Sequence, residues 1–534
     1  MSHFPSADLV LLNGKIFTAD KNNPWAEAAA VFNGRFCSVG SSQNVSPLIG
    51  EKTTVLDLNG RLAVPGFNDA HTHFMDGGFY LRGVDLREAH DEREFISIIE
   101  QKSRELPAGT WITGGCWDHE VWPSNRYPTK TLIDAATTHH PVLVSRLDMH
   151  VSCANSLALQ IAGIDKNTPN PPGGYIEKDS ESGEPTGIVK DTAQELVRRA
   201  IPERTKEEYR AAAKAAMAHA AEYGVTSVQD NTAAIDLKIY NELLASGELT
   251  TRIYAWRGVD FLEQFTELGI TAPFGNSMLR LGCIKIFADG SVGARTACFF
   301  DPYKNDAINS GLLIHQPDTL KEHIEKTDAA GLQLAVHAIG DKTNDLVLSI
   351  FEDIVRRNGK QNRRHRIEHA QVVRPADVAR FAAAGLVVSP QPAGLIDDMR
   401  WAEKVIGDRI DFSFRIKSFL DAGVPLAFGT DWTVEPLNPI IGLYAAVTRE
   451  FPEGGPEDGL NPEERISLEE ALTCYTRGSA YAEFTEHDKG SIEIGKRADV
   501  AVLSQDLFSI PVSEYLNTKV DKTILGGKII YQRN

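Results

Sequence analysis

The sequence predicts an α/β protein built on a (β/α)8 TIM-like barrel, with a small composite β-sandwich from both termini and a long insertion after barrel strand 1. Three observations support this prediction. Strand-like and helical segments alternate between about residues 205 and 480, and turn-rich β segments occur at both ends of the chain. Chemically reactive residues also follow several of the alternating strands. A barrel places its active site at these strand ends.

The first sixty residues contain three Asn-Gly pairs between apolar segments, in DLVLLNGKIF, AAAVFNGRFCSVG and TTVLDLNGRLAVPG. Asn-Gly suits the positive φ angles of a type I′ turn, so we expect β-hairpins there. The chain ends on two more β segments, KRADVAVLS and DKTILGGKIIYQRN. Neither end can bury its own sheet. We therefore expect one composite β-sandwich domain, formed by residues 1–63 plus 488–534.

The middle of the chain, residues 64–487, is expected to form the barrel. Its helix TKEEYRAAAKAAMAHAAEYG begins with a capping box, Thr205 and Glu208. The eight expected strands are the segment from Leu62 to His73 and residues 225–230, 251–256, 279–287, 332–337, 364–369, 386–392 and 424–431. An open doubly wound sheet is the alternative. The absence of GxGxxG after the first strand favours the barrel.

Residues 75–204 separate the first two barrel strands and are too long for a bare loop. The segment contains an apolar strand, PVLVSRLDMH, and a Pro/Gly-rich stretch, NTPNPPGGYIEKDSESGEPTG. Because it leaves the C-terminal end of a barrel strand, we expect an insertion or lid subdomain that covers the active site.

Composition and charge exclude several classes of protein. Hydrophobic residues make up 42% and charged residues 24%, as in ordinary globular proteins. The net charge of −18 disfavours nucleic-acid binding. No apolar run approaches the ~20 residues of a membrane span, and no secretory pattern opens the chain, so we expect a cytoplasmic protein without a membrane partner. The six cysteines form no CxxC pair and are expected to be free thiols.

Five residues at expected strand ends are candidate metal ligands. His71 and His73 are two positions apart, so on a strand both rings face the same side. Two single histidines, His337 and His369, and the carboxylate Asp431 close later strands. An isolated HxH pair more often consists of packed or surface histidines. Four histidines and one carboxylate at strand ends together predict a site for zinc or another divalent transition metal.

Lys285 lies within the apolar segment CIKIFADG. An ammonium group is costly to bury, so a lysine that faces the barrel core should be paired, neutral or modified. A lysine that points outward is the alternative.

These motifs resemble the amidohydrolase superfamily, specifically the amidohydrolase-3 branch that includes N-substituted formamide deformylases. The resemblance runs essentially end to end, through PGFNDAHTH, WDHEVWP, DMHVSCANSLAL, PPGGYI, GEPTGIV, IKIFADGSVGARTA, VHAIGD, RIEHAQ, FGTDW and SIEIGKRADVAVL. It implies one or two divalent ions per chain, with zinc the expected metal.

The resemblance also implies a role for each candidate ligand. His71 and His73 would bind the buried ion, and the other two histidines would bind the more exposed one. Lys285 would be carboxylated and bridge the ions, which also removes the objection to burying it. Asp431 would be both ligand and proton shuttle.

A divalent ion lowers the pKa of bound water to ~7 and so makes hydroxide available. We expect cleavage of the C–N bond of an amide-like small molecule, an N-substituted formamide or N-acyl amine, with Asp431 moving the proton. Lactams, carbamates and esters stay open as substrates. Ring deamination is disfavoured, because the related purine and cytosine deaminases carry a Glu where residues 338–341 have none. A non-catalytic assembly protein built on the same barrel is a remote alternative. Such a protein would be expected to lose metal ligands, whereas this sequence has all six candidate residues.

Candidate substrate contacts come from the insertion and the loops. They are Trp117, His150, Asn155, Arg295 and Trp432, and packing or solvent exposure is the alternative for each. The tryptophans favour an apolar or aromatic group on the nitrogen. His150 and Asn155 are the strongest of the set, because the branch motif DMHVSCANS contains them. The only partner expected is a small-molecule substrate, and a homo-oligomer such as a dimer stays open.

Overall fold

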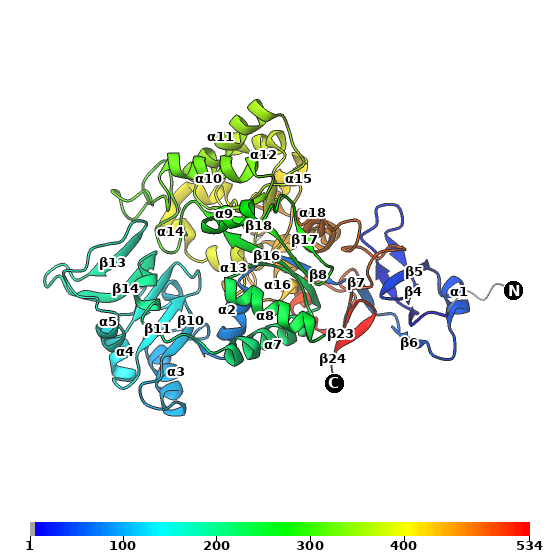
Figure 1. The fold of residues 1–534 in the computed structure, drawn as a ribbon, viewed down its shortest axis with the longest axis horizontal. Helices are drawn as coiled ribbons and strands as arrows, with labels where there is room; N and C mark the ends of the chain where they lie inside the picture. The colour runs from blue at the N-terminus through cyan, green and yellow to red at the C-terminus, as the bar shows by residue number, and fades with distance from the viewer. Residues whose placement is uncertain (1–5, 457, 534) are drawn as a thin grey trace.

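The computed structural model describes residues 6–456 and 458–533. Figure 1 shows three parts in a row: the insertion, the barrel, and the β-sandwich at the end where both chain termini lie. No helix among the described residues combines the length and the apolar character that a membrane span needs.

Seven parallel strands form most of the barrel. They are β8 (Phe67–Thr72), β15 (Val225–Asn231), β16 (Arg252–Gly258), β18 (Leu279–Phe287), β19 (Gln333–Ala338), β20 (Arg366–His369) and β21 (Val387–Ser389). The short β17 (Phe274–Gly275) pairs with β18. Most residues of these strands are buried, as expected where helices cover a parallel sheet and the barrel interior is filled.

The eighth predicted strand, residues 424–431, closes the barrel without forming a regular ladder. The backbone N–H of Ala427 donates to the carbonyl of Val388 in β21, at 3.0 Å. The N–H of Asp431 donates to the carbonyl of His71 in β8, at 2.7 Å. Asp431 has a φ of 55°, which is incompatible with extended backbone and ends the strand-like path. We call residues 424–431 the closing segment.

The predicted first barrel strand, Leu62 to His73, contains two strands rather than one. β7 (Leu62–Pro65) belongs to the β-sandwich, and β8 begins at Phe67 in the barrel. Gly66 lies between them, and a Cβ there would meet the side chain of Thr226 at 2.3 Å. Glycine therefore allows the chain to pass closely over β15 as it enters the barrel.

Both ends of the chain build the β-sandwich. One sheet has the order β5-β4-β1-β6, and the other has the order β24-β23-β22-β7-β2-β3. The remaining bounds are β1 (Leu9–Leu12), β2 (Lys15–Phe17), β3 (Trp25–Ala26), β4 (Ala28–Phe32), β5 (Arg35–Gly40), β6 (Thr54–Asp57), β22 (Val500–Leu503), β23 (Val520–Leu525) and β24 (Lys528–Gln532). C-terminal β22 pairs antiparallel with N-terminal β7, so the sandwich is composite, as the predicted fold class requires.

The three Asn-Gly turns differ from one another. Asn33 and Gly34, both with positive φ, join antiparallel β4 and β5 in a hairpin, as predicted. The hairpins predicted at Asn13 and Asn59 are wrong, because these turns connect strands of different sheets, β1 to β2 and β6 to β7. A positive φ lets the chain reverse tightly, but packing decides which sheet the next strand joins.

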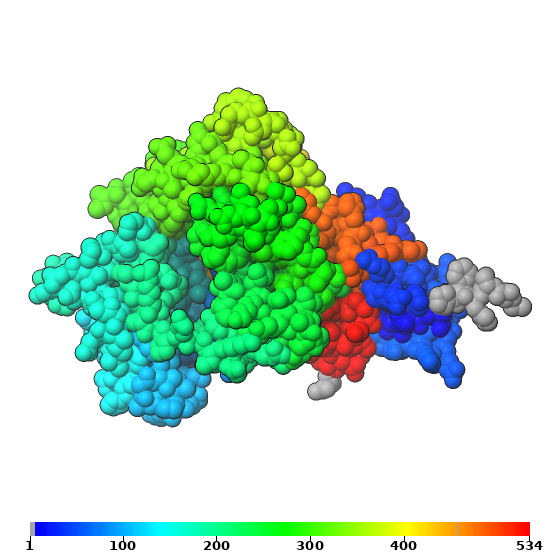
Figure 2. Space-filling view, viewed as in Figure 1, coloured from blue at the N-terminus to red at the C-terminus, as the bar shows by residue number. Residues whose placement is uncertain are grey.

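The insertion has a sheet of its own, in the order β13-β14-β12-β11-β10-β9. Its strands are β9 (Val84–Asp85), β10 (Ile112–Trp117), β11 (Val142–Arg146), β12 (Val151–Ala154), β13 (Gly174–Lys178) and β14 (Pro185–Asp191). Its helices are α3 (Glu92–Glu105), α4 (Lys130–Ala136), α5 (Ser156–Ile161) and α6 (Gln194–Arg198). Figure 2 shows the surface hollowed between the cyan insertion and the green barrel segments.

Helices surround the barrel and follow its strands. They are α2 (Phe74–Tyr80), α7 (Lys206–Glu222), α8 (Ala234–Ala245), α9 (Leu262–Glu267), α10 (Pro317–Ala329), α11 (Asp341–Asn358), α12 (Val378–Ala384), α13 (Gly394–Asp398), α14 (Ala402–Ile406), α15 (Ile416–Asp421), α16 (Pro439–Thr448), α17 (Leu468–Thr473) and α18 (Ser479–Ala482). The short α1 (Ser42–Val45) lies beside the sandwich. The capping box predicted at Thr205 and Glu208 is present at the start of α7.

Candidate metal centre

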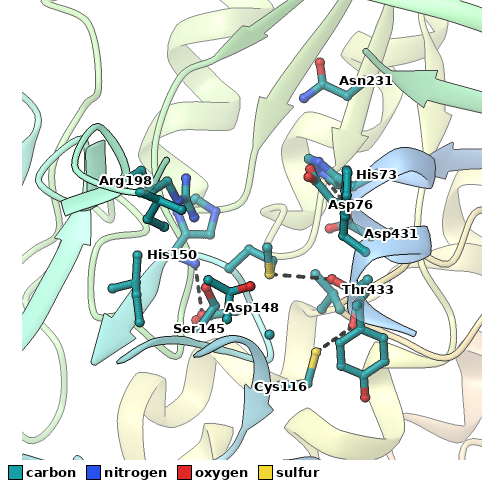
Figure 3. Close-up of a pocket in the computed structure, with 18 of the residues that line it drawn as sticks. His73, Asp76, Cys116, Ser145, Asp148, His150, Arg198, Asn231, Asp431 and Thr433 are labelled. Carbon is teal, nitrogen blue, oxygen red and sulfur yellow. Dashed lines mark hydrogen bonds and ion pairs between the residues drawn. The ribbon is translucent and has the colours of Figure 1, made fainter. Parts of the chain in front are cut away.

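All six candidate ligands line one cavity of about 590 Å³ at the C-terminal ends of the barrel strands. The parallel strands bring together side chains that are far apart in the sequence. They come from β8 and its end, β18, β19, β20 and the closing segment, in the order His71, His73, Lys285, His337, His369 and Asp431. Figure 3 shows His73 and Asp431 on one wall, across the cavity from His150 and Arg198.

The nitrogen and oxygen atoms of these side chains lie close together. Oδ1 of Asp431 is 3.3 Å from Nε2 of His73 and 3.5 Å from Nε2 of His71. Nζ of Lys285 is 3.0 Å from the same Nε2 of His71. The ring centroids of His337 and His369 are 4.4 Å apart. His71, His369 and Asp431 each place one ligand atom within 4.8 Å of the others, the geometry of a metal-binding group.

His71 is held by a carboxylate that sequence reasoning missed. Its Nδ1 lies 2.9 Å from Oε2 of Glu368, and Nε of Arg366 donates to Oε1 of Glu368 at 2.5 Å. All three side chains are buried. The contact to Glu368 places the ring proton on Nδ1 and leaves the lone pair of Nε2 facing the cavity. The available signal was the alternation of Arg366 and Glu368 in the short segment RIEH that ends at the candidate ligand His369.

Asp69 connects β8 to the closing segment, and its role was also missed. Its Oδ1 accepts the backbone N–H of Thr430 at 2.9 Å and that of His71 at 3.1 Å. Its Oδ2 accepts the Thr430 hydroxyl at 2.6 Å. Burial raises the pKa of Asp69 to about 7. These bonds fix Asp431 next to the histidine pair, because Asp431 directly follows Thr430.

Lys285 points inward, not outward to solvent. It is 1% exposed, and its ammonium nitrogen lies 4.8 Å from the ring centroid of Phe287. Burial lowers the pKa of Lys285 to about 8, although Glu368 and Asp431 oppose that shift. A lysine with this pKa is partly neutral near pH 7, which a chemical modification of the amine requires.

Asp431 is a buried carboxylate in a strained position. Its φ of 55° lies in the left-handed region, as does the φ of 69° at His369. Such backbone strain in side chains other than glycine occurs most often at functional sites. Burial raises the pKa of Asp431, but His71, His73 and Lys285 outweigh burial and hold that pKa below its usual range. Oδ1 of Asp431 has no hydrogen-bond partner among the described residues, so a cation fits there.

His337 is oriented by the loop that follows β18. Its Nε2 lies 3.1 Å from the carbonyl of Gly290, so the ring donates through Nε2 and keeps Nδ1 free for a ligand. Asp289 supports the same region by accepting the N–H groups of Ile339 and Gly340, at 3.0 and 2.9 Å. Asp289 was not predicted, and only its position at a strand end could have indicated it.

Among the predicted substrate contacts, only His150 lines the cavity. Its Nδ1 lies 2.6 Å from Oδ1 of Asp191, which leaves the opposite side of the ring free. Burial lowers the pKa of His150, but the contacts with Asp191 outweigh burial and raise the pKa above its usual value. His150 is therefore placed to donate a hydrogen bond into the cavity.

Two predicted contacts lie inside the insertion. Trp117 is fully buried, and its Nε1 donates to the carbonyl of Val144 at 3.0 Å. Asn155 caps α5, where its Oδ1 accepts the N–H of Ala158 at 3.0 Å. Both side chains stabilise the fold of the insertion and do not line the cavity, so their location does not support a substrate contact.

The other two predicted contacts also lie off the cavity. Arg295 pairs with Glu120 at 2.9 Å and so links the loop after β18 to the insertion. Trp432 is 2% exposed and stacks on His219, with a centroid distance of 5.3 Å. Both side chains contact neighbouring residues and not the cavity. Packing, the alternative stated for each residue, therefore accounts for their positions.

The cavity wall contains residues that no sequence pattern had singled out. Apolar and aromatic side chains from α2, β11, α7 and the loops form much of it, and two arginines stand near them. These residues are Phe79, Tyr80, Leu143, Met149, Ile201, Tyr209, Phe287, Val434, Arg198 and Arg204. Half-buried apolar residues of this kind look like ordinary packing residues in a sequence.

Fold and site together define the class of protein. It is a (β/α)8 barrel with a site of imidazole, amine and carboxylate groups at the C-terminal ends of its strands. The free cysteines, five buried and one exposed, take no part in this donor set.

Comparisons with known proteins agree with this class. A model of the amidohydrolase family matches residues 54–531. Protein LONG AFTER FAR-RED 3 from Arabidopsis thaliana is 35% identical over 98% of this chain and 92% of its own length. N-substituted formamide deformylase from Arthrobacter pascens is 30% identical over 98% of each chain. The crystal structure of a metal-dependent hydrolase from Pyrococcus horikoshii is 29% identical, with a TM-score of 0.77, and the match covers 94% of this chain and 99% of that one.

The chain therefore belongs to the amidohydrolase family. This membership confirms the resemblance drawn from the motifs, and it identifies the protein as a hydrolase of the amidohydrolase superfamily.

Proposed function

We propose that the protein is a metal-dependent hydrolase that cleaves the C–N bond of an amide-like small molecule, an N-substituted formamide or N-acyl amine. The main support is the convergence of four imidazoles, a buried lysine and a buried carboxylate with an unpartnered oxygen at the strand ends. The similarity to an N-substituted formamide deformylase and to a metal-dependent hydrolase points the same way.

The donor set fits zinc, which binds imidazole nitrogen and carboxylate oxygen. His71 and His73 would hold one ion, and His337 and His369 a second. Lys285 would bridge them once its amine is carboxylated, and Asp431 would complete the set. Lys285 is close enough to Nε2 of His71, at 3.0 Å, for both to share a ligand site.

A divalent ion would supply a water of lowered pKa and polarise the substrate carbonyl. Asp431 is ionised at neutral pH, because the contacts with His71, His73 and Lys285 hold its pKa low. It can accept the proton of the attacking water and return it to the leaving nitrogen. His150, on the facing wall, can donate a hydrogen bond to the substrate. The products would be an amine and a carboxylate.

The shape of the cavity supports a small organic substrate. Its volume of about 590 Å³ lies in the range of small-molecule sites. Phe79, Tyr80 and Tyr209 form an aromatic wall on the side of α2 and α7. This wall suits an apolar or aromatic group on the amide, as expected from the sequence, although the residues that form it differ from the predicted tryptophans.

A substrate screen with metal analysis tests this proposal. Protein purified without chelator should contain one to two equivalents of a divalent transition metal, by elemental analysis. The metal-replete protein should hydrolyse members of an N-formyl and N-acyl amine library, and lactams, carbamates and esters serve as competing classes. Less than half an equivalent of metal, together with undiminished activity in strong chelator, would overturn the metal dependence. Turnover of only a competing class would overturn the substrate class.

A further inference from the structure

A second, smaller cavity of about 80 Å³ adjoins the main one. The two cavities share His150, His337, His369 and Asp431 as lining residues. Asp431 therefore faces both cavities, whereas His71, His73 and Lys285 line only the main one. We call it the acidic cavity, because four more carboxyl groups line it: Asp148, Asp397, Asp398 and Glu435.

Among the described residues, ion pairs account for only one of these four carboxyl groups, Asp148. Arg146 is the guanidinium in the lining, and it already pairs with Asp118 at 2.6 Å and Asp148 at 2.8 Å. Arg87, nearby, donates to the carbonyls of Thr433 and Val434 instead of to a carboxylate.

The other neighbouring groups are also engaged. Arg400 pairs with Glu453 at 2.6 Å, and the amide of Gln371 donates to one oxygen of Asp398. Asp397 and Glu435 form no ion pair with these cations.

Glu435 provides the clearest indication that the acidic cavity binds a ligand. Its side chain lines the acidic cavity, and the residue is 4% exposed. Among the described residues it has no side-chain hydrogen bond and no ion pair. A buried carboxyl group without a partner is costly and needs a compensating ligand or a proton. Burial raises the pKa of Glu435, and it raises the pKa of Asp398 to about 8.

A divalent metal is not the occupant that this geometry favours. Within the part of the chain that the structure describes, the carboxyl oxygens of the acidic cavity do not form a metal-binding group. The group that does is His71, His369 and Asp431. Carboxyl groups spread around a small volume instead suit a compact cation with several N–H donors, each reaching a different oxygen.

We propose that the acidic cavity binds a small protonated amine, held by Glu435, Asp397 and Asp398. This inference rests on the proposed function, because cleavage of an amide C–N bond releases an amine next to Asp431. A cationic head group on the substrate is a second source of such an ammonium group. Both sources place an ammonium group where Asp431 faces the acidic cavity.

Calorimetric titration of the metal-loaded protein tests binding without requiring turnover. The probes are ammonium, methylammonium and guanidinium chloride at constant ionic strength, with tetramethylammonium as a cation that has no N–H donor and is too large. We expect saturable binding of at least one of the small cations and none of tetramethylammonium. No saturable binding by any probe would overturn the inference and leave the hydrolase proposal intact.

Two variants assign the binding to the acidic cavity. Glu435→Gln keeps the shape of the side chain but cannot ionise to meet a bound cation, and we expect it to weaken cation binding at least tenfold with unchanged metal content. Asp397→Asn provides the same test if the first variant does not fold. Glu403→Gln in α14 is the matched control, because Glu403 is exposed and lines neither cavity. Unchanged affinity in both cavity variants would refute the assignment.

Kinetics then separate the two sources of the ammonium group. If the leaving amine occupies the cavity, Glu435→Gln should weaken inhibition by product amines at least tenfold and should change kcat/KM for neutral and cationic substrates by the same factor. If a substrate head group occupies it, the same variant should lose its preference, in kcat/KM, for cationic over neutral isosteric amides. Either pattern supports the cation site. Absence of both patterns would contradict it.

Discussion

Asp431 combines three properties that a proton carrier at a metal site needs. It is ionised, because His71, His73 and Lys285 hold its pKa low. One of its oxygens is unpartnered, and its backbone is held at a φ of 55° by bonds to the neighbouring strand. A flexible exposed aspartate would lack the last two properties, so the local structure supports the proposed role.

Replacement of Asp431 tests that role directly. Asp431→Asn preserves the shape of the side chain, but the amide cannot accept a proton. We expect hydrolysis to fall by ~10²–10⁴-fold, the usual loss when general-base catalysis is removed, while the other ligands retain metal. Rate and metal content are measured together, with the exposed Asp408→Asn as control. A metal-replete variant within threefold of wild type would exclude Asp431 from the mechanism.

The chemistry of Lys285 depends on its burial, which lowers the pKa of its amine to about 8. Lys285→Ala should lose the bridging ligand and most activity, and acetate or propionate should restore part of the activity by occupying the vacated space. In the wild-type protein, labelled bicarbonate should produce a carbamate signal in the carbon NMR spectrum that the variant lacks. Propionate added to wild type is the control. A variant with wild-type rate and metal content would show that Lys285 is an ordinary buried lysine.

At the scale of elements, the insertion brings one wall of the site to the barrel. His150 lies in the turn between β11 and β12, and Asp191 at the end of β14 fixes its ring. The sheet of the insertion therefore acts as a support that aims one side chain across the cavity at the candidate ligands (Figure 3).

Because the insertion aims His150 into the cavity, replacement of His150 should cause a specific kinetic defect. His150→Ala removes a cavity-facing hydrogen-bond donor, and such bonds contribute about 1.5–3 kcal/mol when one partner is charged. We therefore expect kcat/KM to fall at least tenfold, mainly through KM, with unchanged metal content. His139→Ala is the matched control, because His139 is an exposed residue of the same insertion that lines neither cavity. Equal kinetics for the two variants would remove His150 from substrate binding.

At the scale of the whole molecule, one buried ion pair connects the barrel to the β-sandwich. Arg252 at the start of β16 contacts Asp499, next to β22, through two bonds of 2.7 and 2.8 Å. Both side chains are 5% exposed. Burial raises the pKa of Asp499, but Arg252 outweighs burial and leaves that pKa below its usual value.

The lowered pKa fixes the sign of a pH effect on stability. Asp499 stabilises the fold fully above its unfolded pKa of about 3.9, and this contribution is lost as the pH falls through the lower folded value. Asp499→Asn should cost about 3–5 kcal/mol at neutral pH, because it leaves Arg252 buried and unpaired. Thermal unfolding should show the difference from wild type shrinking below about pH 4.

A surface pair provides the comparison for this prediction. Asp421 pairs with Lys417 on α15 and its side chain is 63% exposed, so Asp421→Asn should change stability by less than about 1 kcal/mol. Equal effects of the two substitutions would show that the Arg252–Asp499 pair does not hold the two parts of the molecule together.

The sequence alone was sufficient for the barrel, the composite sandwich and the positions of the six candidate ligands. These features depend on local patterns: alternation of strands and helices, and reactive residues in the last residues of strands or just after them. Parallel strands in a barrel end at the same edge, so strand-end residues such as His71, His337 and His369 must meet there. Their role as metal ligands stays a proposal, but their convergence follows from chain order.

Only the tertiary structure decided which side chains support and surround that site. Glu368 beside His71, Asp69 beside Thr430 and the acidic cavity at Glu435 all join segments far apart in the chain. The insertion shows the same limit, because Trp117 faces its own core whereas His150 faces the barrel. The direction in which a side chain points depends on how one sheet packs against the next element, and no local pattern records that packing.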